Sequence, residues 1–181
     1  MKQLLSLLLC LSIIVPSMAK KEQRKQNVFP DGTPISEWFL QTKVVHPDSL
    51  GKKYDLSDYG IESNPHIVQT QKIQKIIDEA AANGGGVIYI PEGIYKSGSL
   101  FFKQGTHLYL SKGATLLGSE NIMDFPLLMT RIEGEYCKYF GALINADGLD
   151  TFTISGKGTI DGNGTPYWKA FRLRREWNPQ C

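Results

Sequence analysis

GGGVIYIPEGIYKSGSLFFKQGTHLYLSKGATLLGS, residues 84–119, is the stretch that decides the fold. Short apolar runs recur in it, and glycine, proline or serine separates them. Leu108 and Leu110 alternate with His107 and Tyr109, which is the period of a strand with one buried face. The stretch therefore predicts a series of short β-strands separated by tight corners.

The same pattern continues to residue 162, with one longer gap between Gly118 and Ala142. The predicted strands are VIYIP, GSLFF, HLYLS, ATLLG, ALINA, FTISG and GTIDG. Such spacing fits two all-β architectures. One is an antiparallel sandwich whose strands are joined by hairpins, and the other is a parallel β-helix whose coils stack.

An amphipathic helix precedes these strands. Its apolar positions recur at helical spacing, and Asn83 and Gly84 end it because glycine takes the left-handed C-terminal conformation readily. The apolar residues are Ile73, Ile76, Ile77, Ala80 and Ala81. A helix with one apolar face can cover the open end of a solenoid, where core and strand backbone would otherwise be exposed. This favours an all-β parallel β-helix with an N-terminal capping α-helix.

The first 19 residues have the pattern of a signal peptide. Lys2 precedes an apolar run from Leu4 to Val15, and small residues end at Ala19, where we expect cleavage. The protein is therefore expected to be exported to the periplasm or the cell exterior, without a membrane attachment after cleavage. We expect residues 20–53 to form an N-terminal extension and residues 54–181 to form the β-helix domain.

The composition excludes some kinds of partner. A net charge of +2 without a concentrated basic footprint argues against nucleic-acid binding. No Cys/His pair has zinc spacing, so we expect neither a metal nor a cofactor. Cys137 and Cys181 remain after leader removal, and they could form one disulfide or stay as two thiols. We expect a monomer.

Three segments resemble the N-terminal part of glycoside hydrolase family 28, the polygalacturonase-like pectin hydrolases. They are YDLSDYG at 54–60, IQKIIDEAAANGGGVIYIPEGIYKSGSLFFKQGTHLYLSKGATLLGS at 73–119, and ALINADGLDTFTISGKGTIDGNG at 142–164. The resemblance implies a right-handed parallel β-helix that hydrolyses polygalacturonan or rhamnogalacturonan with inversion. Family members often carry an Asp where this chain has Gln69, so the helix start lacks that cap.

Inverting hydrolysis needs at least two acids that converge on one groove. The resemblance implies that these acids come from Asn-Thr-Asp and Asp-Asp stretches, followed by Gly-His-Gly and Arg-Ile-Lys. None of these motifs occurs in the 181 residues, and the family places them after GTIDG. We therefore assign no catalytic residue in this chain, expect the catalytic acids beyond Cys181, and expect a β-helix that is incomplete at its C-terminal end.

The segment GKGTIDGNGTPYWKAFRLRREW, residues 156–177, holds the clearest binding candidates. We expect Asp161 to stabilise a turn, with Ile160 in the core. Aromatic rings can stack on sugars and guanidinium groups can grip carboxylates, although a solvated surface helix explains the same pattern. The candidate substrate-binding residues are Arg131, Tyr167, Trp168, Lys169, Arg172 and Arg174.

Two other functions share this scaffold. A polysaccharide lyase would cleave by β-elimination with calcium held by clustered acids, and no such cluster is visible in the sequence. A non-catalytic carbohydrate-binding or adhesive β-helix would bind sugars without turnover. The leading expectation remains an exported pectin hydrolase whose partner is an acidic plant polysaccharide.

Overall fold

The computed structural model describes residues 28–40 and 45–177, which fall into two units. In the first unit, Val28 and Pro34 form an antiparallel bridge, and the short helix η1 (Glu37–Leu40) follows. The rings of Trp38 and Phe39 stack with centroids 4.1 Å apart. The predicted signal peptide lies outside the described residues.

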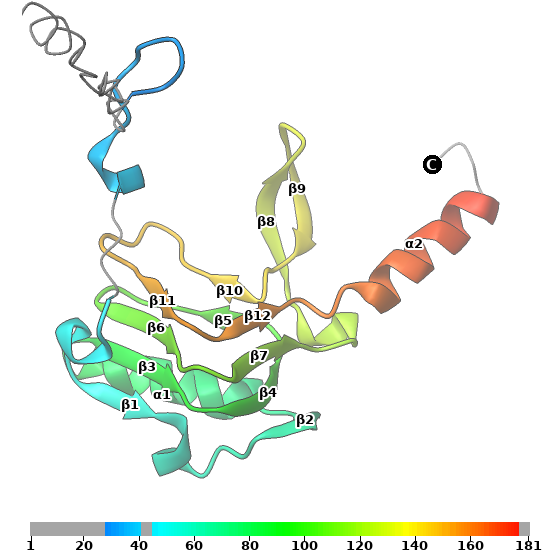
Figure 1. The fold of residues 1–181 in the computed structure, drawn as a ribbon. Helices are drawn as coiled ribbons and strands as arrows, with labels where there is room; N and C mark the ends of the chain where they lie inside the picture. The colour runs from blue at the N-terminus through cyan, green and yellow to red at the C-terminus, as the bar shows by residue number, and fades with distance from the viewer. Residues whose placement is uncertain (1–27, 41–44, 178–181) are drawn as a thin grey trace, which may run out of the picture. The chain divides into compact units, whose positions relative to one another are not determined.

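The second unit is a parallel β-helix built from three sheets (Figure 1). One sheet has the order β1-β3-β6-β11, another β12-β7-β4-β2, and the third pairs β10 with β5; all of these pairs are parallel. This confirms the β-helix over the sandwich. The strands are β1 (Lys53–Asp55), β2 (Asn64–Val68), β3 (Gly86–Ile90), β4 (Gly93–Ser97), β5 (Leu100–Phe101), β6 (Thr106–Leu110), β7 (Ala114–Gly118), β10 (Ile144–Asn145), β11 (Ile154–Gly156) and β12 (Thr159–Asp161).

Buried apolar side chains stack in register inside the coils. Ile88 of β3 lies opposite Leu108 of β6, and Tyr95 of β4 lies opposite Leu116 of β7. All four side chains are buried in one apolar cluster. Burying an aliphatic side chain of this size contributes about 1.5–3 kcal/mol, so each stacked pair stabilises the coils.

The capping helix is α1 (Thr70–Ala82), and it occupies the third side of the first coil. Ile73, Ile76 and Ile77 point into the core, as predicted. At its end, Gly85 N–H donates to the Ala80 carbonyl at 2.8 Å, and Gly84, with φ +90°, donates to that of Ala81 at 3.2 Å. These bonds form a Schellman motif, which confirms the predicted helix end.

The helix start has no side-chain cap, as the sequence indicates. The buried Gln69 side chain instead accepts a hydrogen bond from the Glu62 N–H at 3.2 Å and donates to the Glu62 carbonyl at 2.8 Å. Its own backbone N–H donates to the carbonyl of Lys96 at 2.9 Å. Gln69 therefore joins the loop before β2 to the sheet beneath it.

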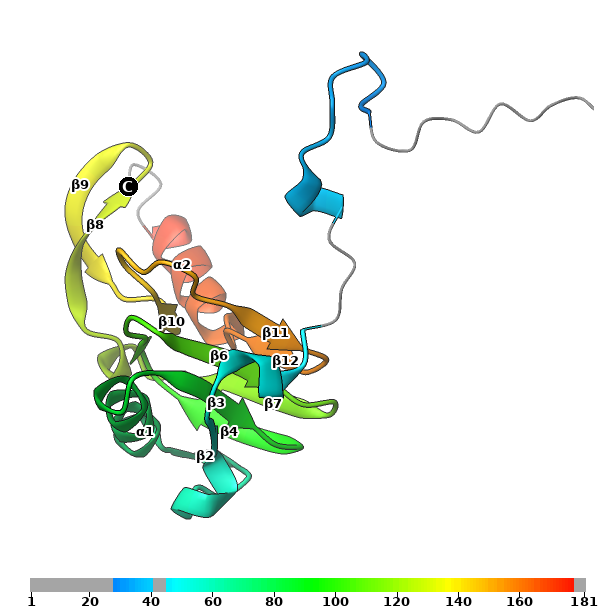
Figure 2. The ribbon, with the colours of Figure 1, turned by 90° about the vertical axis from the view of Figure 1, so that its left-hand side faces the viewer.

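The longer gap between Gly118 and Ala142, for which the sequence predicts no strand, holds two strands. It contains η4 (Ile122–Asp124) and an antiparallel hairpin of β8 (Leu127–Ile132) and β9 (Glu135–Phe140), which stands away from the stacked coils (Figures 1 and 2). Positive φ angles at Glu133 and Gly134, 52° and 96°, fit a two-residue turn whose twist matches the strands. The polar residues within both strands conceal this hairpin in the sequence.

The last coil departs from the predicted burial. Ile160 lies in register with the buried Leu116, but it is 43% exposed. Ile154, in register with Leu108, is 48% exposed. No described strand pairs with the outer edges of β11 and β12, so no further coil in the described chain completes the burial of these two side chains. The expectation that Ile160 lies in the core is therefore wrong for this structure.

Candidate functional site: a carbohydrate-binding surface

The segment YWKAFRLRREW forms the helix α2 (Thr165–Trp177), in which no residue is buried. It carries four basic residues and one acidic residue, a net charge of +3, whereas the whole chain carries only +2. Trp168, Phe171 and Trp177 are 64%, 49% and 87% exposed. Positive charge and exposed aromatic area therefore coincide on this helix.

One face of α2 combines rings with guanidinium groups. The rings of Trp168 and Phe171 meet edge to face with centroids 6.1 Å apart, and the Arg175 guanidinium lies 5.8 Å from the Phe171 centroid. Arg172 and Glu176 complete the lining of a shallow surface depression. Such a face can stack a sugar ring and hold its carboxylate.

Tyr167 does not belong to this face. Its hydroxyl donates a 2.6 Å hydrogen bond to the carbonyl of Ser119, and its ring meets that of Phe125 edge to face. Burial raises its pKa, and the charges of Asp124 and Glu120 add to the effect. Tyr167 therefore anchors α2 to the end of β7, a role that its neighbours in the sequence do not indicate.

The other predicted residues are exposed and divide into two places. Lys169, Arg172 and Arg174 lie on α2, with Arg174 beside Leu173 and Trp177 in a second depression. Arg131 lies on β8, where its Nε donates to the Gly134 carbonyl at 3.4 Å. The structure thus gathers the α2 residues and places Arg131 on a separate element.

The predicted disulfide involves one residue that the structure does not describe. Cys137 lies on β9 opposite Thr130 and is half-buried. Cys181 lies outside the described residues, so the pairing stays a prediction.

Asp161 stabilises a turn, as predicted. Its Oδ1 accepts a 2.8 Å hydrogen bond from the backbone N–H of Asn163, which has a positive φ of 49°. The side-chain Nδ2 of Asn163 in turn donates to the Gly118 carbonyl at 3.1 Å, which ties this corner to the coil below. Asp161 is therefore part of the scaffold.

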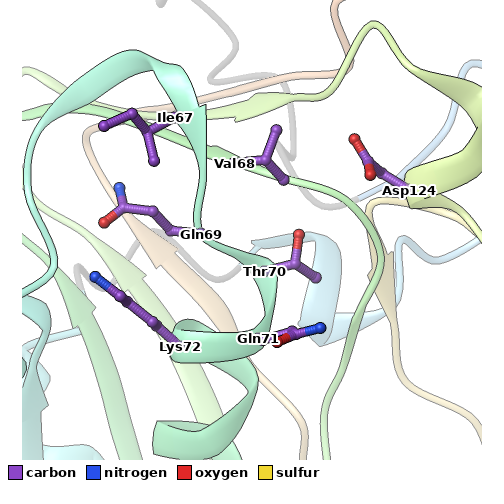
Figure 3. A pocket seen from close by; sticks show the side chains of 7 residues that line it. All are labelled: Ile67, Val68, Gln69, Thr70, Gln71, Lys72 and Asp124. Atoms are coloured by element: carbon purple, nitrogen blue, oxygen red, sulfur yellow. The ribbon is translucent and has the colours of Figure 1, made fainter.

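A pocket of about 390 Å³ lies at the start of α1 (Figure 3). Figure 3 shows Asp124, from η4, facing Val68 and Thr70. The remaining lining residues are Ile67, Gln69, Gln71 and Lys72. Asp124 is its only acid, and the Ser119 hydroxyl donates to that carboxylate at 2.5 Å. Because glycoside hydrolysis needs two acids, this pocket does not supply that chemistry.

An ion pair lies near the same corner. Lys96, whose side chain is only 7% exposed, contacts Glu120 at 2.7 Å. The hydrogen bond from Lys96 lowers the pKa of the Glu120 carboxyl. The pair explains how β4 can hold a lysine within a buried strand. The sequence does not predict β4 as a strand, because Lys96 interrupts its apolar pattern.

Within the part of the chain that the structure describes, no group of three or more metal-ligating side chains is found. Among the same residues, no helix combines the length and the apolar character needed to cross a membrane.

The chain is similar in sequence to three characterised or named proteins. It is 34% identical over 152 residues to the exo-poly-α-D-galacturonosidase of Dickeya chrysanthemi, which covers 80% of this chain and 24% of that protein. It is 28% identical over 125 residues to the grapevine (Vitis vinifera) protein named "Probable polygalacturonase", covering 64% of this chain and 26% of that protein. It is also 37% identical over 129 residues to the plasmin and fibronectin-binding protein A of Streptococcus pneumoniae, covering 69% and 17%.

Solved structures agree with the fold. The family 28 exopolygalacturonase of Yersinia enterocolitica superposes with a TM-score of 0.54 at 33% identity, covering 62% of this chain and 21% of that one. The exopolygalacturonase of Thermotoga maritima gives 0.58 at 22% identity, covering 66% and 26%, and supports the fold alone.

No protein-family model matches the chain. It spans about a quarter or less of the length of the curated relatives. The chain therefore has the parallel β-helix fold of the glycoside hydrolase family 28 polygalacturonases, and over the matched residues it is similar in sequence to polygalacturonases.

Proposed function

We propose that the protein is an exported glycoside hydrolase that cleaves glycosidic bonds of pectin, in polygalacturonan or rhamnogalacturonan, with inversion. The 34% identity to an exo-poly-α-D-galacturonosidase is the observation that carries the proposal. The leader pattern of residues 1–19 supports export. Hydrolysis of pectin is also consistent with the second relative, a polygalacturonase.

We further propose that the catalytic acids lie outside the 181 residues. The family's acidic motifs are missing from the sequence, and the pocket beside α1 has the single acid Asp124. The chain also spans only 24% of the exo-poly-α-D-galacturonosidase. In this proposal residues 54–164 supply the first coils, on which a catalytic groove would be built.

The role proposed for α2 is to bind uronate groups of the substrate. Arg172 can form paired hydrogen bonds with a carboxylate, and Trp168 beside it offers a ring for stacking. Lys169 and Arg174 would add less specific attraction to an acidic glycan, which salt screens.

The proposed reaction is tested by the structure of the first sugar that is released. The protein from the complete gene is incubated with polygalacturonate, and the anomeric configuration of the released sugar is followed by NMR. We expect the released sugar to have the inverted anomeric configuration, and we expect no unsaturated uronates, which would be detected by their ultraviolet absorbance. A retained configuration would contradict inversion, and unsaturated products would show a lyase. Absence of any cleavage would overturn the hydrolase proposal.

A second candidate is a non-catalytic adhesive β-helix. It is favoured by one observation, the 37% identity to a streptococcal protein named for binding plasmin and fibronectin. An adhesin would bind a host protein and release no reducing sugar from pectin. Surface plasmon resonance with immobilised fibronectin, beside the hydrolysis assay, separates the two candidates.

A further inference from the structure

The hairpin β8–β9 has an exposed side that does not pack against the stacked coils. Alternation along the strands puts the cross-strand pairs Leu127–Phe140, Met129–Lys138 and Arg131–Tyr136 on one side. The outer half of this side, formed by Met129, Arg131, Tyr136 and Lys138, is here called the hairpin face. Tyr136 is 78% exposed and Met129 is 65% exposed.

The charge on the hairpin face is of one sign. Arg131 and Lys138 are its charged residues, whereas Glu133 lies in the turn and Glu135 pairs with Ile132 on the other side. The described residues provide no salt-bridge partner for either cation. The bond from Arg131 Nε to Gly134 holds this side chain at the turn and leaves both terminal NH₂ groups available.

The spacing suits a chain of acidic sugars. Arg131 lies opposite Tyr136 and diagonal to Lys138, so the backbone positions of the two cations are about 7–8 Å apart. Tyr136 is paired with Arg131 and lies two positions before Lys138 on β9, so all three residues are on the same side of the hairpin. An exposed aromatic ring flanked by cations matches a sugar ring whose neighbours carry carboxylates.

We propose that the hairpin face is a binding surface for an acidic polysaccharide of the uronate class. This inference rests on the proposed function, because pectin is the source of such a chain. Charge complementarity argues for this occupant over a second copy of the protein, which would bring the same cations together.

The experiment uses the full 181-residue chain and a defined oligogalacturonate, with its methyl ester as the uncharged probe. Binding is measured by isothermal titration calorimetry for wild type and for Arg131→Gln/Lys138→Gln. The matched control is Lys112→Gln/Lys157→Gln, which removes two cations from exposed corners of the coils. Circular dichroism checks that each variant is folded.

We expect the hairpin double variant to bind oligogalacturonate at least tenfold more weakly, because it loses two charge-assisted contacts to carboxylates, and the control to stay within about twofold. The methyl ester should bind wild type weakly. Tyr136→Ala should weaken binding too, while Tyr136→Phe keeps the stacking ring and should restore most of it.

Equal affinity of the hairpin variant and wild type for oligogalacturonate would overturn the proposal that the hairpin face binds it. So would undetectable binding by wild type, equal binding of the methyl ester, or a dimer that sedimentation shows to be lost in the variant. Hydrolysis by the protein from the complete gene is measured alongside. If the protein from the complete gene hydrolyses polygalacturonate but the hairpin variant binds as well as wild type, the hairpin face alone is rejected. If hydrolysis and oligogalacturonate binding are both absent, the proposed function is rejected as well.

Discussion

The side-chain amide of Gln74 pairs with the backbone of Phe101 as a neighbouring strand would. Its Nε2 donates to the Phe101 carbonyl at 2.9 Å, and its Oε1 accepts from the Phe101 N–H at 2.8 Å. Gln74 lies on α1, and Phe101 lies in β5, whose other edge pairs with β10. The capping helix thereby satisfies strand backbone as well as covering the apolar core.

Gln74→Ala should lower the free energy of unfolding by about 1–3 kcal/mol, because it leaves a partly buried N–H and carbonyl without their partner. Chemical denaturation in urea measures the loss. The control is Gln71→Ala. Gln71 is an exposed residue of the same helix, and its side chain forms no hydrogen bond within the described chain. Equal effects of the two substitutions would contradict the pairing role.

Gly156→Ala should be strongly destabilising, by about 2 kcal/mol or more. Gly156 has φ +107°, and a Cβ there would collide with the Leu110 carbonyl oxygen in the coil below. Gly162→Ala is the control, since a Cβ at that position meets nothing within 4 Å. Thermal melting of both variants checks the prediction, and similar melting temperatures would refute it.

The Lys96–Glu120 pair should make stability fall in acid. The pKa of Glu120 is lowered in the folded state, so its contribution is present at neutral pH and is lost as pH falls through that pKa. Melting temperatures of wild type and Glu120→Gln should therefore differ at pH 7 and converge below about pH 4.

Glu135→Gln serves as the control for this pH dependence, because Glu135 forms no ion pair among the described residues. Asp78, whose pKa is lowered by Lys103, remains in all three proteins. The comparison therefore isolates Glu120. A constant difference between wild type and Glu120→Gln across the pH range would contradict the assignment.

Tyr167→Phe should loosen α2 without unfolding the coils. It removes one hydrogen bond to Ser119, which is worth about 0.5–1.5 kcal/mol, and keeps the ring contact with Phe125. Hydrogen exchange should become faster in residues 165–177. Tyr139→Phe removes a hydroxyl without a hydrogen bond in the described structure, and it should leave that exchange unaltered.

Periodicity predicted the coils because the core is built from repeated local patterns. Leu108 and Leu110 alternate visibly, and the spacing of Ile73, Ile76 and Ile77 identifies α1. These residues all face one core, so their burial follows the period of their own strand or helix, and the sequence carries that signal directly.

Residues whose role depends on a distant partner were harder to identify. Lys96 is compatible with a strand only because Glu120 lies 24 positions further on, and Tyr167 is an anchor because Ser119 lies 48 positions before it. Polar residues interrupt the apolar ones in both strands of the hairpin, as Thr130 and Arg131 do in β8 and Lys138 does in β9, so neither side of the hairpin is continuously apolar. The strand pattern therefore shows only a longer gap between Gly118 and Ala142.

Release of reducing ends from polygalacturonate is the most direct test of the central proposal. It compares the 181-residue chain with the protein from the complete gene at equal molar concentration. We predict hydrolysis by the complete product, and none by the 181-residue chain even where that chain binds the polymer. Hydrolysis by the 181-residue chain would contradict the location given to the catalytic acids, and an inactive complete product would contradict the enzyme itself.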